Sequence, residues 1–598
     1  MHLSQIKIYA ASILFLVNTY AFAQEKPIIA TSKDSTFVAY HLVMDSLIVT
    51  PRDETPQSIL RNRTTLAHGN AAHKFAADTE LTTAIPGVTA DLERDLPGLI
   101  TFYTANGIPI LTKQTQNHSL TPAIPYNIID LSISEPGAAL SGPDAVVTYR
   151  PIYKSTKNII LDPLHQGVSF AGGENRRFSA ALVTEYTSPG LLENYIDELD
   201  AYAQTTSGLA AARFKTERSK LEVMGQHLYS DNEFGALFDV NLFRETSSMY
   251  SGFAAATHNI GPLTFEAGYG HQRATARTQM DELHKELHSD QETLLAHSYK
   301  FGVNVNRTSL AVFYHDVERT FADTTTGVLD TQVIATHKQP VADYIFVTVS
   351  GRIDHHDNQT HPSASVKLMY AATENIILEV NAAHLYDPII SQGMGSDLRD
   401  ATKYTKPITT QYASIHSRYS TPYWQITTDV KVKSVSLSWY NQPAEINGIV
   451  LGNSVQRTFW WDHRALTLRI STRQRWMKLD VNGRDQQQMP GPTPFKAGIR
   501  AEYATDGYGV SVDAQIYSSR TQSLKEHITV DLGKLLLLNF GVTKRFGPVN
   551  MGLSIGNSLG LFRENKLLAY QRRISEVDSE IEYIMAPFIP GISVGIDF

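Results

Sequence analysis

The sequence predicts an all-β transmembrane barrel of about 22 antiparallel strands behind an N-terminal segment of mixed structure. Three observations predict it: apolar and polar residues alternate through most of the chain, the chain opens on a secretory leader, and it ends on an aromatic residue in an alternating stretch. A closed barrel accounts for all three, because closure leaves no unpaired backbone edge in lipid.

The last stretch is the most specific of these signals. In residues 592–598 every second side chain is apolar, and the last of them is Phe598. Such a segment places its apolar side chains on one face of a strand. We interpret it as the strand that closes the sheet against the first one.

The same alternation recurs from about residue 165 onward. Representative runs are 299–306, 363–370, 376–382, 434–439, 510–516 and 549–556. Their polar partners would face bulk water in a soluble sandwich and a wet lumen in a large barrel. In the run 434–439, for example, a barrel puts Val435 on the lipid side and Ser434 and Ser436 in the lumen. The periodicity fits both folds, and the leader and Phe598 favour the barrel.

Composition limits the function classes. The chain has 598 residues, is 42% hydrophobic and has a mean hydropathy of −0.20. After residue 24 it has no apolar run near the roughly 18–20 residues of a membrane helix, but a barrel exposes only alternate residues to lipid. A net charge of −8 without a basic patch does not indicate nucleic-acid binding. The absence of cysteine excludes disulfides, thiolate nucleophiles and cysteine-ligated metals.

The N-terminus is typical of a signal peptide, predicted here as residues 1–23. Lys7 precedes the apolar stretch 8–17, and Ala21-Phe22-Ala23 offers a small-residue cleavage site. The alternative is a membrane anchor, for which the apolar stretch is short.

Connections of unequal length are expected between the strands. Short turns are predicted at 306–308, 372–375 and 546–548, and long polar connections at 272–291, 318–340, 391–407 and 482–494. Outer-membrane barrels pair short periplasmic turns with long external loops. Residues 24–163 alternate less and are rich in proline, which indicates a separate compact segment.

An ordered series of short motifs resembles the TonB-dependent outer-membrane receptors. A β-prone hexapeptide about 20 residues after the leader looks like the TonB box, which pairs by strand addition with the coupling protein. Read alone, it could be an ordinary strand of the N-terminal segment. Its residues are Asp45, Ser46, Leu47, Ile48, Val49 and Thr50.

Further matches follow in the family's order. They are 55–66 (first plug helix), 81–88 (helix into Pro-Gly-Val), 106–110 (Asp-Gly-Val-Pro turn), 127–130 and 138–146 (late plug strand and loop), 539–542 and 557–559 (penultimate strands) and 590–591. The resemblance implies a signal peptide at 1–23, a TonB-box segment at 24–50, a plug domain inside the lumen at 51–163 and a barrel at 164–598.

Two departures from the family pattern concern the plug. The family's Arg-Gly pair is replaced by Pro97-Gly98, and its later Leu-Arg-Gly-Pro by Ser134-Glu135-Pro136-Gly137. In the family these arginines pair with carboxylates of the barrel wall. Removing one member of such a pair is costly, so the joint loss implies a plug that is held differently.

The resemblance implies energy-coupled uptake of a scarce nutrient such as a siderophore, cobalamin or a metal complex across the outer membrane of a Gram-negative cell. The partners would be TonB with ExbB and ExbD, the outer-membrane lipid and a small-molecule or metal-chelate ligand, with no resident cofactor. The plug apex would contact the ligand, and its candidate residues are Asn106, Lys113, Gln114 and Gln116. The alternative is a non-transporting barrel of the same fold: a passive pore, an adhesin or an assembly component.

Catalysis is not expected. Gly552-Leu553-Ser554-Ile555-Gly556 matches a nucleophile elbow, but that elbow needs a strand-to-helix turn and Ser554 lies within an alternating run. Five histidines in two presumed connections could instead capture a metal ion, as imidazoles beside carboxylates do, or could simply be solvated. They are His284, His288, His355, His356 and His361.

Overall fold

A computed structural model describes the chain from residue 102 onward, with gaps. The described residues are 102–105, 108–110, 129–134, 146–151, 153 and 156–596, except 162–164, 174–175, 188–200, 235–241, 282–287, 322–323, 357–358, 388–407, 440–441, 462–463, 482–483, 487–493, 506, 524–528, 557, 559–565, 574–578 and 586–588. All regular elements of this part except a single 3₁₀ residue at Ser558 are β-strands.

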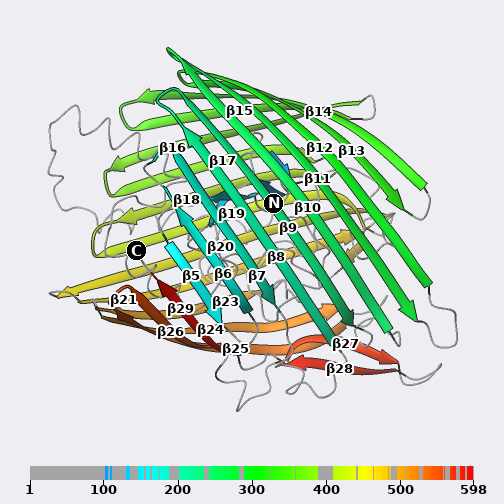
Figure 1. Cartoon of the computed structure of the whole chain (residues 1–598), viewed down its shortest axis with the longest axis vertical. Helices are drawn as coiled ribbons and strands as arrows, with labels where there is room; N and C mark the ends of the chain where they lie inside the picture. Colours follow the sequence, from blue (N-terminus) through cyan, green and yellow to red (C-terminus); the bar gives the residue numbers. More distant parts are fainter. Residues whose placement is uncertain are drawn as a thin grey trace.

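A closed barrel makes up most of the molecule, as predicted (Figure 1). Its strands follow one another around the ring in chain order, each antiparallel to the next, and β29 closes the ring against β5. These are twenty-two strands, with the three-residue β22 as a branch on β21. The strands are β5 (Thr156–Leu161), β6 (His165–Gly172), β7 (Phe178–Thr187), β8 (Ala201–Lys215), β9 (Ser219–Phe234), β10 (Leu242–Ile260), β11 (Leu263–Asp281), β12 (His288–Val305), β13 (Thr308–Phe321), β14 (Thr324–Ala342), β15 (Ile345–His356), β16 (Gln359–Thr373), β17 (Ile376–Asp387), β18 (Ile408–Ser420), β19 (Trp424–Trp439), β20 (Gln442–Trp461), β21 (Arg464–Val481), β22 (Arg484–Gln486), β23 (Phe495–Ala504), β24 (Tyr508–Ser523), β25 (Thr529–Phe546), β26 (Val549–Gly556) and β29 (Ile589–Ile596).

The ring is closed by the pairing of its last strand, β29, with its first strand, β5. Val594 lies opposite Ile159 in the β29–β5 pair. The barrel therefore begins at Thr156, eight residues before the expected boundary at 164. The pattern missed β5 because Ile159 and Ile160 are adjacent and break the alternation.

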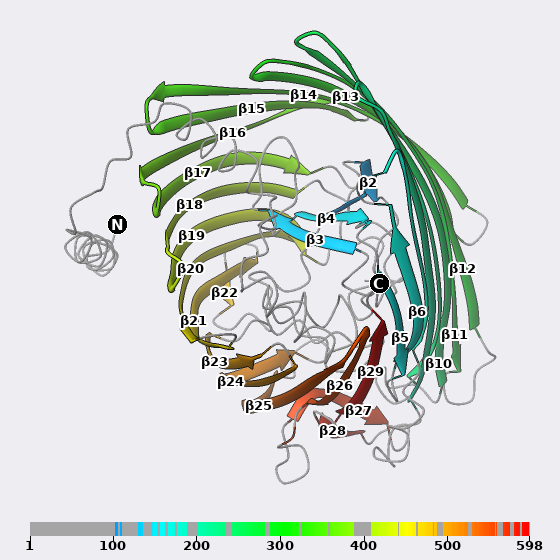
Figure 2. The same ribbon diagram turned by 60° about the vertical axis from the view of Figure 1, so that its left-hand side comes forward.

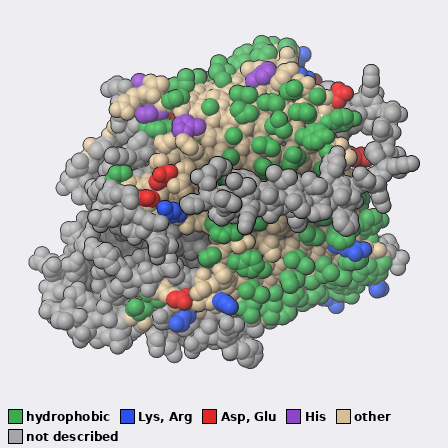
Figure 3. All heavy atoms as spheres, turned by 180° about the vertical axis from the view of Figure 1, so that it is seen from behind, with side chains coloured by type: hydrophobic (Ala, Val, Ile, Leu, Met, Phe, Trp, Pro, Cys, Tyr) green, Lys and Arg blue, Asp and Glu red, His purple; other side chains and the backbone are tan. Residues whose placement is uncertain are grey.

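The two faces of the wall differ as the alternation predicts. Along β12 the aromatic residues Tyr299 and Phe301 are exposed on the outside, and along β26 Leu553 is 59% exposed. The inner face carries buried polar side chains such as Gln272 and Asp354. Figure 3 shows the outer surface from behind, where hydrophobic side chains cover much of the described wall and charged ones lie mainly toward its margins. This is the surface that a lipid-embedded barrel requires.

The turns after Val305, Thr373 and Phe546 lie at one end of the barrel, and all connections between barrel strands of more than five residues lie at the other, together with a few short ones. The predicted turns after Val305 and Phe546 are confirmed, with Asn306 and Gly547 at φ 51° and 59°. The predicted turn at 372–375 is also confirmed, since β16 ends at Thr373 and β17 begins at Ile376.

Two of the four predicted long connections are wrong in extent. β11 continues to Asp281 and β12 begins at His288, so most of 272–291 is strand. Only 322–323 separate β13 from β14, so most of 318–340 is strand as well. The connection 482–494 is confirmed, because β21 ends at Val481 and β23 begins at Phe495, with the short β22 between them. The connection 391–407 lies outside the described residues. Beyond the lipid both faces of a strand meet polar surroundings, so backbone pairing continues where the apolar alternation stops.

The face assignment of 434–439 was also wrong. Val435 is fully buried on the inner face, and Ser436 is exposed on the outer face. Ser434 Oγ donates a hydrogen bond of 3.0 Å to Glu445 Oε1, also on the outside. Val432, two residues before Ser434, is the exposed apolar residue of β19.

A small separate sheet lies inside the ring (Figure 2). Its order is β2 (Ile108–Ile110), β1 (Phe102–Ala105), β4 (Val146–Pro151) and β3 (Ile129–Ser134). β1 and β2 form an antiparallel hairpin around 106–107, and β1 pairs in parallel with β4. This sheet is the described part of the predicted plug; the predicted plug helices lie outside the described residues.

A two-stranded sheet, β27 (Lys566–Arg573) with β28 (Ser579–Met585), lies in the connection between β26 and β29. No helix of the described residues is long and apolar enough to cross a membrane.

Candidate ligand passage and plug contacts

Most of the predicted site residues cannot be placed. The TonB-box-like segment 45–50 and the apex residues Asn106, Lys113, Gln114 and Gln116 lie outside the described residues, and so does His284. Of this part of the chain the structure describes β1 and β2, which lie inside the ring.

The other four histidines lie on strands and not in loops. His288 begins β12, while His355 and His356 are the last two residues of β15. His355 is exposed on the outer face beside Thr360, whereas His361 stacks on Tyr386 with ring centroids 3.7 Å apart. Among the described residues no three His, Asp or Glu side chains form a group that could hold a metal ion. Metal capture by these histidines stays a prediction.

The inner sheet contacts the barrel wall through Ile108. This side chain is 0% exposed and lies against two glycines of β11. A Cβ added at Gly268 would lie 3.0 Å from Cδ1 of Ile108, and one at Gly270 would lie 3.1 Å from its Cγ2. Carbon atoms pack best at about 3.5–4.0 Å, so only glycine leaves room for Ile108 here. Gly268 and Gly270 thus form a notch in the wall that receives the plug.

Tyr153 makes a second contact between the N-terminal segment and the wall. It follows β4, is 2% exposed, and its hydroxyl donates a 3.2 Å hydrogen bond to Glu222 Oε1 on β9. The Arg213 guanidinium lies 4.4 Å from the centroid of the Tyr153 ring, a cation–π contact. Burial, followed by the charge of Glu222, raises the pKa of Tyr153 well above its usual range. The phenol therefore stays neutral, and its proton remains available to the Glu222 carboxylate.

Neither contact was predicted from the sequence. A Gly-x-Gly pair in a strand is a signal for a close approach by another backbone or side chain, and the pair at 268–270 could have been read in this way. Tyr153 carries no comparable signal, because an isolated tyrosine near a strand start is common.

One sector of the lumen wall is acidic. On β14 and β15, Asp330 and Asp354 are 1% and 0% exposed. Asp354 accepts a 2.7 Å hydrogen bond and ion pair from Arg352 Nε, and Arg352 also bonds the carbonyl oxygen of Tyr386. The amide of Gln332 donates a 3.0 Å hydrogen bond to Asp330. Each buried charge thus has a polar partner, as the low dielectric inside a protein requires.

A second sector, further around the ring on β19, β21 and β23, is mainly basic. Its inward-facing cations include Lys431, Lys433, Arg473, Arg475 and Lys496, with the carboxylates Asp429 and Glu502 on the same face. Arg473 lies directly opposite Lys496 across the β21–β23 pair. Lys433 and Lys496 also lie 5.9 and 5.3 Å from the ring centroids of Tyr412 and Tyr517. A lumen with an acidic and a basic sector suits a polar ligand that carries charge of its own.

The one nucleophile that the sequence suggested lies in a regular strand. Ser554 lies in the middle of β26, paired with Gly541 and Gly591, so the strand context expected for it is confirmed. A nucleophile elbow needs a sharp strand-to-helix turn, which this strand does not make.

No model of a known protein family matches the sequence, and no curated protein sequence matches it. Solved structures do match. The ferric citrate transporter FecA in the unliganded form has a TM-score of 0.65 at 11% identity, over 87% of this chain and 92% of that one. A mutant of the ferric enterobactin receptor PfeA from Pseudomonas aeruginosa has a TM-score of 0.63 at 12% identity, over 89% and 96%. The ferric yersiniabactin uptake receptor FyuA from Yersinia pestis has a TM-score of 0.62 at 8% identity, over 86% and 91%.

At such low identities the likeness is one of fold. The chain has the fold of the TonB-dependent outer-membrane siderophore receptors over nearly its whole described length. This family consists of transporters and not of enzymes.

Proposed function

We propose that this protein imports a scarce, bulky nutrient across the outer membrane of a Gram-negative cell, powered by TonB with ExbB and ExbD. The observation that carries the proposal is the closed barrel with an inner sheet docked on its wall through Ile108. A barrel that is occupied by its own chain does not leak freely, so passage needs a rearrangement. The structural neighbours named above as ferric citrate, enterobactin and yersiniabactin receptors support a siderophore-like cargo, with cobalamin or another metal complex as alternatives.

The ligand would enter at the end with the long connections and contact the apex around Asn106 together with the charged sectors of the wall. Asp45–Thr50 would then pair with TonB by strand addition. Pulling on this segment would shift the plug, whose Ile108 and Tyr153 contacts hold it to the wall. No covalent chemistry enters the cycle, because the partner supplies the work.

The decisive experiment removes strand addition while leaving the barrel intact. Ile48→Pro with Val49→Pro removes two backbone donors from the proposed pairing segment. We expect uptake of the transported member of a panel (radiolabelled ferric citrate, ferric enterobactin and cobalamin) to disappear while its binding to whole cells is kept. Ser46→Ala, which leaves the backbone donors in place, is the matched control. Unchanged uptake in the double proline variant refutes the proposal.

A passive pore, an adhesin or an assembly component is the second candidate, favoured by the missing plug arginines. Planar-bilayer recordings separate the candidates. A large steady conductance of the wild-type protein supports the passive pore, whereas a sealed barrel supports the receptor.

A further inference from the structure

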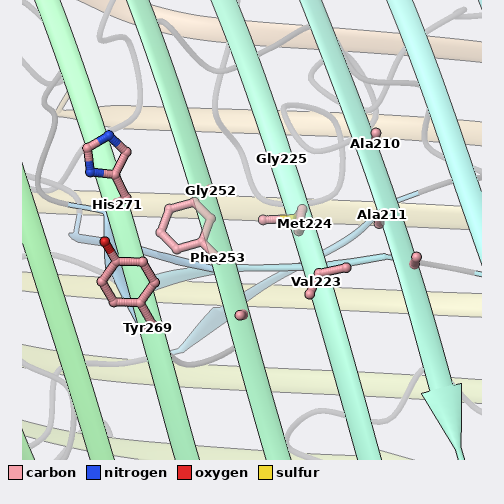
Figure 4. A pocket seen from close by; sticks show the side chains of 11 residues that line it. Ala210, Ala211, Val223, Met224, Gly225, Gly252, Phe253, Tyr269 and His271 are labelled. Carbon is pink, nitrogen blue, oxygen red and sulfur yellow. The ribbon is translucent and has the colours of Figure 1, made fainter.

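The outer face of the barrel has a depression across β8, β9 and β10 (Figure 4). Its volume is about 420 Å³, and outward-facing small residues of these adjoining strands form its floor. We call them the small-residue floor: Ala210, Ala212, Gly225, Gly252 and Ala254. The exposed side chain of Val223 lies between Ala212 and Ala254. Register places them side by side, since Ala210 lies opposite Gly225 and Gly225 opposite Gly252. A Cβ added at either glycine would meet no atom within 4 Å.

Large exposed side chains enclose this floor on the same face. Leu182 on β7 and Tyr269 on β11 flank it, and Phe214 with Leu221 lie toward the end with the short turns. Toward the other end, His227 and Tyr250 are the next outward pair of β9 and β10, with ring centroids 4.6 Å apart. Large side chains therefore flank the depression, which is shallow and open to the outside.

The aromatic side of the depression marks the membrane interface. The Tyr269 hydroxyl lies 3.0 Å from His297 Nδ1, and the Tyr269 ring makes a tilted contact with Tyr299, which in turn contacts Tyr314. Rows of tyrosine typically lie at headgroup level. Because Tyr269 lies directly opposite Ala254 of the floor, the depression lies at or just below this interface, in the leaflet at the end with the long connections.

A cation stands directly beyond this row. Arg273 is exposed on the outer face, opposite Tyr250, and Arg277 follows on the same face of β11. Carboxylates of this face, Asp316 and Glu318, lie two strands away on β13. Arginine binds phosphate in a bidentate geometry, and a cation near a membrane surface attracts anionic lipid.

We propose that the depression holds one acyl chain of a phosphate-bearing lipid whose headgroup is bound by Arg273. In hydrocarbon the chain gains no hydrophobic energy, so the preference for this place comes from packing against the floor and its sides. The guanidinium adds the selectivity for an anionic headgroup. This site is separate from the lumen and does not depend on what the barrel transports.

Native mass spectrometry of the full-length protein in detergent tests the site, with phosphatidylglycerol and phosphatidylcholine of identical acyl chains as probes. We expect one retained phosphatidylglycerol per wild-type barrel, in preference to phosphatidylcholine. Gly225→Leu with Gly252→Leu fills the floor and should abolish retention of both lipids. The pair Gly225→Ala and Gly252→Ala adds only two methyl groups in open space and should reduce lipid retention in part. It tests the floor even if the leucine variant does not fold. Ala267→Leu, on the same face but outside the depression, is the matched control and should retain lipid.

The headgroup is tested separately. Arg273→Gln should lower the preference for phosphatidylglycerol about fivefold, the factor expected for one cation near a membrane surface. Arg307→Gln, in the turn at the opposite end, should leave it unchanged. Equal retention of the two lipids by the wild type, retention unaffected by the floor variants, or a second protein chain at the site in place of lipid each overturns the proposal.

Discussion

The notch formed by Gly268 and Gly270 gives a prediction at the level of single atoms. Gly268→Ala puts a Cβ 3.0 Å from Cδ1 and 3.2 Å from Cγ1 of Ile108. Overpacking of this kind costs about 1–3 kcal/mol. Since about 1.4 kcal/mol is a factor of ten, the ratio of docked to undocked inner sheet should fall roughly 5- to 150-fold.

The identity of the clashing atom allows a selective rescue. Ile108→Val removes Cδ1 but keeps a carbon at the position of Cγ2. Alone it should cost about 0.5–1.5 kcal/mol of docking free energy. Combined with Gly268→Ala it should cost less than the sum of the two single changes, because the closest contact is gone. Combined with Gly270→Ala it should give no relief, since that Cβ meets Cγ2 at 3.1 Å and Phe253 at 3.2 Å.

Planar-bilayer conductance measures the undocked population, and sensitivity of cells to a large antibiotic measures it in vivo. Gly225→Ala is the control, because its Cβ would meet nothing within 4 Å. If Gly268→Ala conducts no more than Gly225→Ala, or if Ile108→Val rescues both notch variants equally, then Ile108 does not dock the plug as argued.

Three further predictions concern the wall and its anchor. Exposed tyrosines ionise near pH 10, and Tyr153 should ionise only above that range. The difference in phenolate absorbance between the wild type and Tyr153→Phe should therefore stay at zero through that range. The contribution of Tyr153 to stability is complete below about pH 10 and is lost as the pH rises further, because the unfolded chain releases this proton at a lower pH than the folded chain. Arg352→Leu removes the ion-pair partner of the buried Asp354 carboxylate and should cost about 3–5 kcal/mol of unfolding free energy, seen as a lower temperature at which the folded band disappears in heat-modifiability gels; a band as stable as wild type would contradict this. Leu553→Arg, on the lipid face, should cost about 2–4 kcal/mol by urea unfolding in lipid vesicles, and Thr308→Arg, beside a turn, about 0–1 kcal/mol; equal costs would refute the lipid-facing assignment.

The sequence could predict the barrel because the alternation that identifies a strand lies within a single short run of residues. Alternation in 299–306 and 549–556 fixes which side chains face outward, and the structure confirms those faces at Phe301 and Leu553. The same rule failed at Val435, because that part of β19 turns an apolar side chain to the lumen and serines to the outside. It also failed for the extent of β14, since strands above the lipid are polar on both faces.

By itself the sequence determined the class of the fold, the approximate number of strands and the closure by its last segment, because these follow from a period of two and from the need to satisfy the backbone in lipid. Only the tertiary structure decided how the plug is held. The contacts of Ile108 with Gly268 and of Tyr153 with Glu222 join residues 160 and 69 positions apart. Packing between such distant residues depends on where the closed ring places them, and no local pattern records that.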